Sequence, residues 1–598
     1  MRDRTAVKAV MKISMASDIA ERVQRAWGES PFYQSKLKGP APDRFVFKPE
    51  YPFAVDQTLG QLILANSIDL DGGLADYERE FHQTVSRSSK YGEFRKFLHG
   101  FVWLSALASV GEKGQVKALS LAKAWFAEHE KWSSESWAPD LTAERLFALC
   151  CYSDVVSPSG DITWRSRVLT SMARQTRHLA NTCHRIECPE NRLNSALSLC
   201  LTAICLPGCQ EALERGFELL RRELRLQLRI DGGHVSRNPS QQLQIVVRLQ
   251  MVFVALQATQ RQPPGFLTHM LGRARSHLDL FRLGDGRLAV FNGATEDDAK
   301  ALVSALQRSS GYEEPTGFAK RSGFQRLEAA RSVVVVDVGA GNGEADLAQL
   351  SDVRYAGTGS FYFSSGKCRI IVNCGPGEAL PGDWERLLRL PDAHTTLSFL
   401  NDQKDARPVD VVFGSAAHRR AENDGGQLLE ISRAITNNGL PLNGTGRKRS
   451  RQVTNDWNKT SSVDLNGLDR GPNNDITFAR HLRHFYLDAS GSDLRGQDEL
   501  VGVCGPIGAY WRLRFHLHPS VKASLARDGR SVLLALPNRE GWRFRSNCKK
   551  ISIEKSVYTG AGEGPIPSEQ IVLSGSGLEN SFPGDILVKW GFQRIDDG

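Results

Sequence analysis

Polar side chains that could bind a ligand or take part in catalysis are concentrated in the stretch "LRIDGGHVSRNPSQQLQIVV", residues 228–247. Gly232 and Gly233 suit the end of one helix, because glycine adopts the left-handed conformation found there. Asn238 and Pro239 suit the cap and first turn of the next helix. His234, Ser236 and Arg237 are then held in a tight loop between two helices. Three hydrogen-bonding side chains in such a loop suit a carboxylate ligand, although they also suit plain solvation.

A second candidate is "VVVVDVGAGNGE", residues 333–344, in which Gly339, Gly341 and Gly343 alternate. Such a loop binds S-adenosylmethionine or a dinucleotide only between a strand and a helix of a parallel βαβ unit. The runs on both sides resemble further strands, and no second crossover unit is visible. We therefore predict a buried strand that turns through glycines in a hairpin, and keep a methyltransferase as a minor alternative.

Helices are expected to position the loop that carries His234, Ser236 and Arg237. After an N-terminal segment of residues 1–59, apolar residues recur at helical spacing from about 60 to 275. Seven or more helices are predicted, including the runs "EFRKFLHGFVWLSALASV", "LTAERLFALCCYSDVV", "RLNSALSLCLTAICL" and "EALERGFELLRRELRLQL". We expect an all-helical domain over this region.

Strands are expected to position the glycine motif at residues 333–344. From about residue 285 to 598, short alternating or β-branched runs dominate, among them "GRLAVFNG", "GSFYFSSGKCRIIVNCG", "YWRLRFHLHPSV" and "SEQIVLSG". Gly, Asp and Asn separate them, which predicts an antiparallel sandwich. Residues of about 437–475 are rich in Asn, Gly and Ser and are predicted to be a flexible insertion, for which a nucleic-acid-binding arm is the less favoured alternative.

Bulk composition narrows the class of protein. The formal net charge of +9 suits a polyanionic partner but also no partner, and the eleven cysteines show no CxxC pair. No GxSxG, P-loop or HExxH motif occurs, so hydrolase, NTPase and zincin functions lack support. No segment reads as a signal peptide or a membrane span, which favours a soluble cytoplasmic protein with export unproven.

The loop at His234 resembles the corresponding stretch of the heparinase II/III-like family of polysaccharide lyases. "SGFQRLEAARSVVVVDVG", "YAGTGSFYFSSGKCRIIVNCGPG" and "AHTTLSF" are similar to the strands and signatures of that family's β domain. These matches, with others, span roughly residues 130–590. The resemblance implies an incomplete (α/α) toroid carrying a groove, followed by an antiparallel β-sandwich.

The implied activity is β-elimination of an acidic, uronate-containing glycan. Such an enzyme neutralises the uronate carboxylate and places a base at the ring. By resemblance, Asn191 contacts the carboxylate, Arg192 replaces a family histidine, and Gln241 and Gln242 replace a Tyr-His pair. Arg237, Trp137 and His394 complete the predicted substrate-binding set; Trp137 would stack on a sugar ring, and a place in the core is its alternative. His234 and Tyr355 are the candidates for the missing imidazole and phenol, with a loop cap and a packed aromatic as their alternatives.

The family's metal ligands correspond to Tyr355, Asn373 and His394, so we expect no bound metal and no cofactor. The leading hypothesis is a lyase whose partner is an acidic polysaccharide. A catalytically impaired glycan-binding or envelope protein is the alternative, and family membership leaves the periplasm open as a location. No nucleic acid partner is expected.

Overall fold

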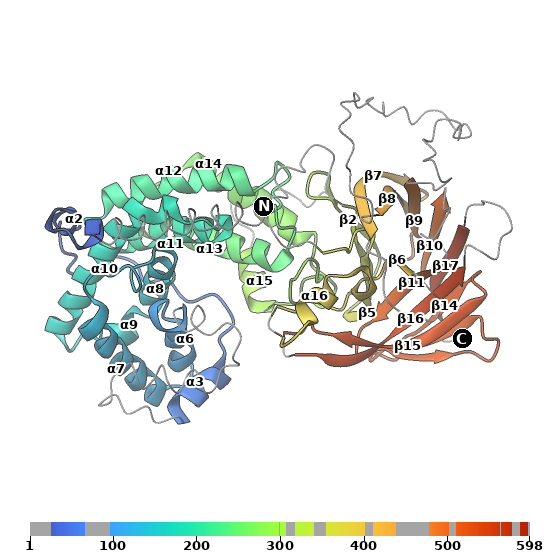
Figure 1. Cartoon of the computed structure of the whole chain (residues 1–598), viewed down its shortest axis with the longest axis horizontal. Coiled ribbons are helices and arrows are strands. Elements are labelled where there is room, and N and C mark those ends of the chain that lie inside the picture. Colours follow the sequence, from blue (N-terminus) through green and yellow to red (C-terminus); the bar gives the residue numbers. More distant parts are fainter. Residues whose placement is uncertain are drawn as a thin grey trace, which may run out of the picture. The chain divides into compact units, whose positions relative to one another are not determined.

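The structure is a computed structural model that describes residues 26–65, 96–297, 299–306, 317–339, 355–378, 380–400, 411–437, 478–501, 510–562, 564–576 and 586–595. These residues form two compact units, shown in Figure 1. The helical unit takes its described residues from 1–228 and 244–272. The β unit takes them from 229–243, 273–306 and 313–598. The predicted insertion beyond residue 437 lies outside the described residues.

Helices dominate the first part of the chain, as the apolar spacing predicts. Their bounds are α2 (Pro31–Lys36), α3 (Gln57–Ala65), α6 (Val102–Ala108), α7 (Glu112–His129), α8 (Pro139–Cys151), α9 (Ser153–Val156), α10 (Ile162–Thr182), η2 (Cys183–Arg185), α11 (Pro189–Cys205), α12 (Gln210–Gln227), α13 (Pro239–Ala258), α14 (Gly265–Asp279) and α15 (Ala299–Leu306). Helix α10 lies within the predicted helical region, but no individual run was recognised for it, because arginines and other polar residues separate its buried residues, among them Val168, Met172 and Leu179.

Buried polar side chains help to join the helices. Arg145 on α8 is fully buried and donates from Nε to Gln175 Oε1 of α10 at 2.8 Å and from Nη1 to the Ser136 carbonyl at 2.9 Å. Helix α10 itself begins at a defined cap, since the Asp161 carboxylate accepts from the Trp164 amide at 3.0 Å. These bonds help to fix α8 and α10 beside each other.

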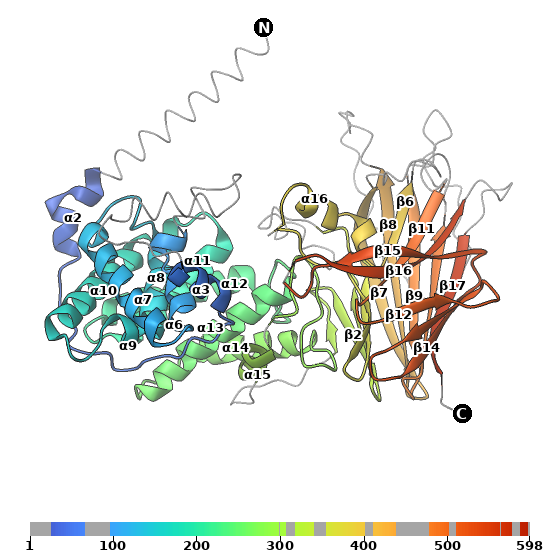
Figure 2. The ribbon, with the colours of Figure 1, turned by 90° about the horizontal axis from the view of Figure 1, so that it is seen from below.

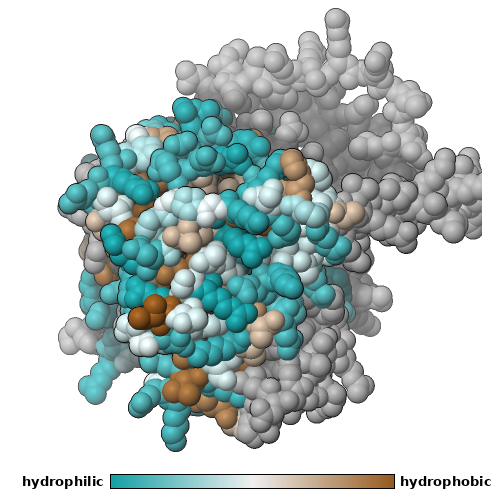
Figure 3. All heavy atoms as spheres, turned by 90° about the vertical axis from the view of Figure 1, so that its left-hand side faces the viewer, coloured by the Kyte–Doolittle hydropathy of each residue, from teal (hydrophilic) through white to brown (hydrophobic). Residues whose placement is uncertain are grey.

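The face of the helical unit seen in Figure 3 is mostly hydrophilic, with hydrophobic side chains scattered over it. The exposed apolar residues of this unit include Phe32, Val116 and Ile162. Single exposed apolar residues are normal on a globular protein. In the described part of the chain, none of the helices has both the length and the apolar character needed to cross a bilayer.

Strands build the β unit, as predicted. Their bounds are β1 (Phe318–Ala319), β2 (Phe324–Ala329), β3 (Ser332–Asp337), β4 (Phe361–Ser365), β5 (Cys368–Val372), β6 (Leu397–Leu400), β7 (Val411–Asn423), β8 (Gly426–Asn437), β9 (Phe478–Leu487), β10 (Asp493–Val501), β11 (Tyr510–Leu517), β12 (Lys522–Leu525), β13 (Ser531–Ala535), β14 (Gly541–Ser546), β15 (Lys550–Tyr558), β16 (Ile566–Ser576) and β17 (Ile586–Ile595), with α16 (Trp384–Leu388) and η4 (Pro391–Ala393) between β5 and β6. The predicted strand "GRLAVFNG" is wrong: only Leu288 forms a β-bridge, to Arg282.

Two antiparallel sheets make up the sandwich, and Figure 2 shows their strands side by side. In the described residues one sheet has the order β1-β2-β3-β4-β5-β11-β16-β15, with β6 also on β11. The other has the order β12-β13-β14-β17-β10-β9-β8-β7. Their inner faces share one apolar core, in which the rings of Phe361 and Trp590 stack at 5.5 Å with an interplanar angle of 7°. The predicted order of toroid-type helices followed by an antiparallel sandwich is confirmed.

The glycine motif lies within the first sheet. Strand β3 is buried and pairs antiparallel with β2 on one side and β4 on the other. Gly339, which follows it, has φ of 79°. An S-adenosylmethionine loop requires a parallel crossover, so this pairing excludes that use of the motif. Residues 340–354, which include Gly341 and Gly343, lie outside the described residues.

Charged side chains of the second sheet reach into the core and hold two loops of the first. Arg483 on β9 donates to the Gly359 and Thr395 carbonyls at 2.9 and 3.0 Å. Arg433 on β8 donates to the Thr358 carbonyl and, at 3.1 Å, to Thr396 Oγ1. A buried pair of His481 and Asp498 lies beside them, with 2.7 Å between Nε2 and Oδ1. The loops at 357–360 and 394–396 are therefore fixed from within.

We predict that Gly496→Ala on β10 destabilises the β unit. An added Cβ would lie 2.0 Å from the Trp590 ring, and that ring holds Asp498 through a 2.7 Å hydrogen bond. Overpacking of this kind costs about 1–3 kcal/mol. Chemical denaturation should show the loss, whereas Gly591→Ala, whose nearest contact would be an ordinary 3.5 Å, should be nearly neutral. Equal stabilities for the two variants would contradict this packing.

Candidate functional site

The His234 loop, residues 229–238, is closed by its own glycines and by Gln242. Gly232 has φ of 84°, and a Cβ there would lie 2.2 Å from the Arg273 carbonyl oxygen. Gln242 is buried: its Oε1 accepts from the His234 amide at 2.8 Å, and its Nε2 donates to the carbonyls of Gly232 and Ala274 at 2.9 Å each. The predicted loop exists, but α12 ends earlier than expected, at Gln227.

The start of α13 follows the prediction. Asn238 Oδ1 accepts from the Gln241 amide at 3.1 Å, as an N-cap residue does, and Pro239 is the first helical residue. Gln241 is partly buried, and its Nε2 has no hydrogen-bond partner among the described residues. The two glutamines thus differ: Gln242 fastens the loop, whereas Gln241 keeps an unused donor.

His234 faces the interior. It is 1% exposed, and its Nδ1 lies 2.7 Å from Ser236 Oγ. Burial, and secondarily the charge of Arg229, lower the pKa of His234 to about 3. The imidazole is therefore neutral at physiological pH and enclosed by protein. In this arrangement it holds the loop rather than meeting a substrate.

Arg237 binds the loop to the first sheet. Its φ is 57°, and its Nε donates to the Ser322 carbonyl at 2.8 Å. Its Nη2 pairs with Asp337, the acid of the glycine motif, and the guanidinium lies 4.7 Å from the Phe324 ring centroid. Asp337 also accepts from the Gly339 amide at 2.8 Å. The two motifs that the sequence presents separately therefore meet in one ion pair.

Tyr355 and His394 lie in edge-to-face contact, with ring centroids 6.1 Å apart. The Tyr355 hydroxyl donates to the Glu378 carboxylate; burial first, and this carboxylate second, raise the pKa of Tyr355 above its ordinary value. His394 is 4% exposed, and neither ring nitrogen has a hydrogen-bond partner among the described residues. Burial lowers the pKa of His394 to about 4. The phenol is thus protonated and the imidazole neutral at pH 7.

Asn373, at the position of a family metal ligand, is committed to its neighbours. Its Oδ1 accepts from the Thr395 amide at 3.0 Å, and its Nδ2 donates to Ser360 Oγ at 3.3 Å. Across the described residues, no group of three or more His, Cys, Asp or Glu side chains is placed to hold a metal ion. The donor set around His394 therefore does not fit a metal centre.

The two groups of residues in the β unit are connected through Asn292 and Gly293. Asn292 Nδ2 donates to the Arg237 carbonyl at 2.9 Å, and Asn238 Nδ2 donates to the Asn292 carbonyl at 3.0 Å. The next residue, Gly293, lies against Tyr355, since an added Cβ would be 2.7 Å from the phenol oxygen. The His234 loop and the Tyr355–His394 pair thus form one continuous region.

The three predicted residues of the helical unit have different surroundings. Asn191 is exposed at the first turn of α11. Arg192 Nε pairs with the buried Glu223 carboxylate at 2.8 Å, and its Nη1 donates to the Ile186 carbonyl at 2.7 Å. Trp137 is 1% exposed and packs against Tyr33 and Leu37. The sugar-stacking role of Trp137 requires an exposed ring face, which this burial does not leave.

Sequence reasoning missed the buried Arg433, Arg483 and His481, which hold the loops beside Tyr355 and His394. A signal for two of them was present. In "FARHLRHFYL" of β9, His481 and Arg483 fall at the same alternation as Phe485 and Leu487, which face the core. A charged residue at an inward position of a strand indicates a buried polar network.

Comparisons with known proteins agree with this architecture. Residues 313–589 match the family described as "Heparinase II/III-like, C-terminal". The chain is also 28% identical over 557 residues to the FtsZ-localized protein C of Caulobacter vibrioides, across 91% of this chain and 90% of the relative.

Solved structures show the same fold. Heparinase III matches with a TM-score of 0.60 and 14% identity, across 86% of this chain and 79% of that one. The heparan sulfate lyase of Pedobacter heparinus matches with a TM-score of 0.56 and 13% identity, across 98% of this chain and 91% of that one. This likeness shows a shared fold of helices followed by an antiparallel sandwich. Residues 313–589 thus match the C-terminal domain of the family that the sequence resembles.

We predict that Arg237→Ala strongly destabilises the β unit. Asp337 has a side chain only 2% exposed and would lose its cationic partner. Removing one member of a buried pair costs about 3–5 kcal/mol. The free energy of unfolding from urea titration should fall accordingly. Arg495→Ala, which removes a pair whose arginine is 69% exposed, is the control and should change stability little. A small loss for both would show that the Arg237 pair does not fasten the loop.

We also predict that stability falls as the pH drops from about 6.5 to about 4. Burial is the main cause that lowers the pKa of several histidines to about 3 or 4, whereas they titrate near 6.5 when unfolded. The unfolded chain therefore binds more protons than the folded chain between about pH 4 and pH 6.5. Above this window, the contribution of these histidines to stability is constant. The histidines are His178, His234, His277, His394, His481 and His516.

Urea midpoints measured from pH 4 to 8 test this dependence. His394→Gln should reduce the slope of unfolding free energy against pH by about one proton, or about 1.4 kcal/mol per pH unit. His269→Gln, at an exposed histidine, provides the matched control, and the change in slope should be larger for His394→Gln. If the unfolding free energy of the unaltered protein did not change with pH below 6, the histidines would not be buried in their neutral form.

Proposed function

We propose that this chain is a non-catalytic protein on a lyase scaffold, and that it works by binding at the site of cell division in association with FtsZ. The observation that carries the proposal is the state of the two candidate bases. His234 is buried in its loop, and the Tyr355 hydroxyl already donates to Glu378. β-Elimination needs a group that accepts a proton from the sugar ring, and neither residue is prepared for this.

The carboxylate-binding side is altered as well. Arg192, which stands for a family histidine, is paired with Glu223 and with backbone carbonyls. Gln241 and Gln242 stand for the family's Tyr-His pair, and an amide does not transfer protons at neutral pH. The relative whose name places it with FtsZ aligns over nine-tenths of both chains, which supports a shared role in division.

A second candidate is a lyase that acts on acidic glycans, and the fold likeness to heparinase III favours it. In that case Tyr355, next to His394, would take the proton next to the uronate carboxylate. Arg237, Gln241 and His394 would position the sugar. This candidate requires Tyr355 to lose its proton despite the neighbouring carboxylate of Glu378, which works against it.

Co-sedimentation with FtsZ polymers tests the proposed function. We expect the purified chain to pellet with polymerised FtsZ and to stay in solution with FtsZ kept unpolymerised. A fluorescent fusion in the native cell should gather at the division site. A chain that stays in the supernatant with polymers, and is spread evenly in cells, would overturn the proposal.

A lyase assay separates the two candidates. The chain is incubated with heparan, chondroitin, alginate and bacterial exopolysaccharides, and the ultraviolet absorbance of unsaturated product is followed beside a heparinase as positive control. We expect no product. Product formation that Tyr355→Phe abolishes and His269→Gln preserves would instead establish the lyase.

A further inference from the structure

A cavity of about 450 Å³ opens in the β unit, with walls that no role assigned above uses. We call it the Lys367 pocket. Its walls include Arg287, Glu296, Lys367, Arg369, His518 and Asn538. Lys367 comes from the turn between β4 and β5, and Asn538 from the turn between β13 and β14. Tyr355, His394 and the His234 loop are not among the residues that line it.

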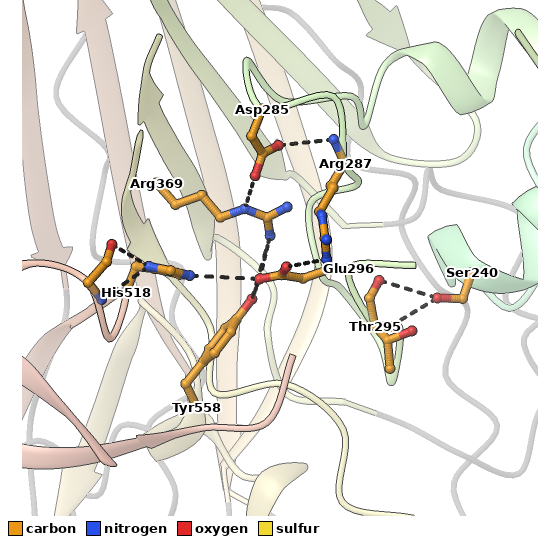
Figure 4. A network of polar contacts seen from close by, with 9 residues as sticks. Ser240, Asp285, Arg287, Thr295, Glu296, Arg369, His518 and Tyr558 are labelled. Atoms are coloured by element: carbon orange, nitrogen blue, oxygen red, sulfur yellow. Dashed lines mark hydrogen bonds and ion pairs between the residues drawn. The ribbon is translucent and has the colours of Figure 1, made fainter. Parts of the chain in front are cut away.

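The base of the pocket is a buried ionic network, drawn in Figure 4. Arg369 is 3% exposed; its Nε lies 2.7 Å from Asp285 Oδ2 and its Nη1 lies 3.2 Å from Glu296 Oε1. Tyr558 donates to the same Glu296 oxygen at 2.6 Å. The partners of Glu296 lower its pKa to about 2 against the cost of burial, so the carboxylate is charged and fully used.

One guanidinium nitrogen in this network makes no hydrogen bond to a described residue. Among the described residues, Nη2 of the buried Arg369 has no hydrogen-bond partner. A buried guanidinium normally uses its donors, because an unsatisfied charged group costs free energy. The base of the pocket therefore holds one guanidinium nitrogen whose hydrogen-bonding capacity Asp285 and Glu296 leave unsatisfied.

The rim adds further positive charge. Lys367 is exposed and forms no ion pair with a described residue. Arg287 is 47% exposed at its side chain and shares Glu296 at 3.2 Å. The permanent cations Arg287, Lys367 and Arg369 outnumber the carboxylates Asp285 and Glu296. His518, whose Nε2 lies 3.7 Å from Glu296, becomes an additional cation when protonated.

Neutral hydrogen-bonding groups complete the walls. Asn538 is exposed; its Oδ1 accepts from the Glu540 amide at 3.1 Å, which leaves its amide NH₂ to donate to a ligand. Ser520 on the rim supplies a hydroxyl. The volume is within the range of small-molecule pockets. Excess positive charge together with amide and hydroxyl groups suits a ligand that is both anionic and hydroxylated.

We propose that the Lys367 pocket binds a small acidic sugar, one that carries a carboxylate or a phosphate group. Lys367 and Arg287 contact the anionic oxygens, Arg369 supplies charge from below, and Asn538 and Ser520 contact sugar hydroxyls. This site goes beyond the proposed function, because it does not depend on association with FtsZ or on lyase chemistry.

Isothermal titration calorimetry of the full chain tests the proposal with three probes. Glucuronate carries a carboxylate, glucose 6-phosphate carries a phosphate, and glucose carries neither. We expect at least one acidic sugar to bind at millimolar or lower concentration and glucose to give no heat. The acidic probe that binds more tightly identifies the anionic group.

Variants at an exposed turn keep the test independent of folding. Lys367→Ala should weaken binding about tenfold, since a charge-assisted hydrogen bond contributes roughly the free energy of a tenfold change in affinity. Lys367→Arg should retain most of it, and Lys549→Ala, at an exposed lysine outside the pocket, should leave it unchanged. The proposal fails if neither acidic sugar binds, if glucose binds equally well, or if Lys367→Ala and Lys549→Ala have the same effect.

Discussion

The ion pair between Arg237 and Asp337 is the interaction on which the rest of the candidate region depends. It joins the loop before α13 to the end of β3, and the same carboxylate accepts from the Gly339 amide. From this point Asn238 donates to the Asn292 carbonyl and Asn292 donates to the Arg237 carbonyl, which links the loop to Gly293 and Tyr355. A loop that is anchored so firmly is a structural element, and this anchoring keeps His234 and Gln242 buried.

Much of the fold could be predicted from local patterns. The spacing of apolar residues located most helices, alternation located most strands, and Asn238 with Pro239 marked the start of α13. The failures have physical causes. The stretch at 286–293 has the alternation of a strand, yet only Leu288 finds a bridge partner, because pairing is decided by tertiary neighbours. Polar residues that separate the apolar positions hid α10.

The site could be predicted less well, because motif positions carry no information about burial. The sequence brings His234, Arg237 and Gln242 together correctly, but it does not reveal that His234 and Gln242 are 1% exposed. Trp137 shows the same difficulty, since a tryptophan beside a groove and one in a core have the same local sequence. The Lys367 pocket combines turns far apart in the chain, so no local pattern could have indicated it.

Gln242 has a consequence for how this protein can change. All of its polar atoms are used, with one bond accepted from the His234 amide and two donated to the carbonyls of Gly232 and Ala274. A histidine at this position, as the family's Tyr-His pair would require, cannot make the same three bonds. Gln242→His would therefore open the loop. A different side chain at position 242 is therefore tolerated only if other residues of the loop change with it, because three hydrogen bonds must be replaced together.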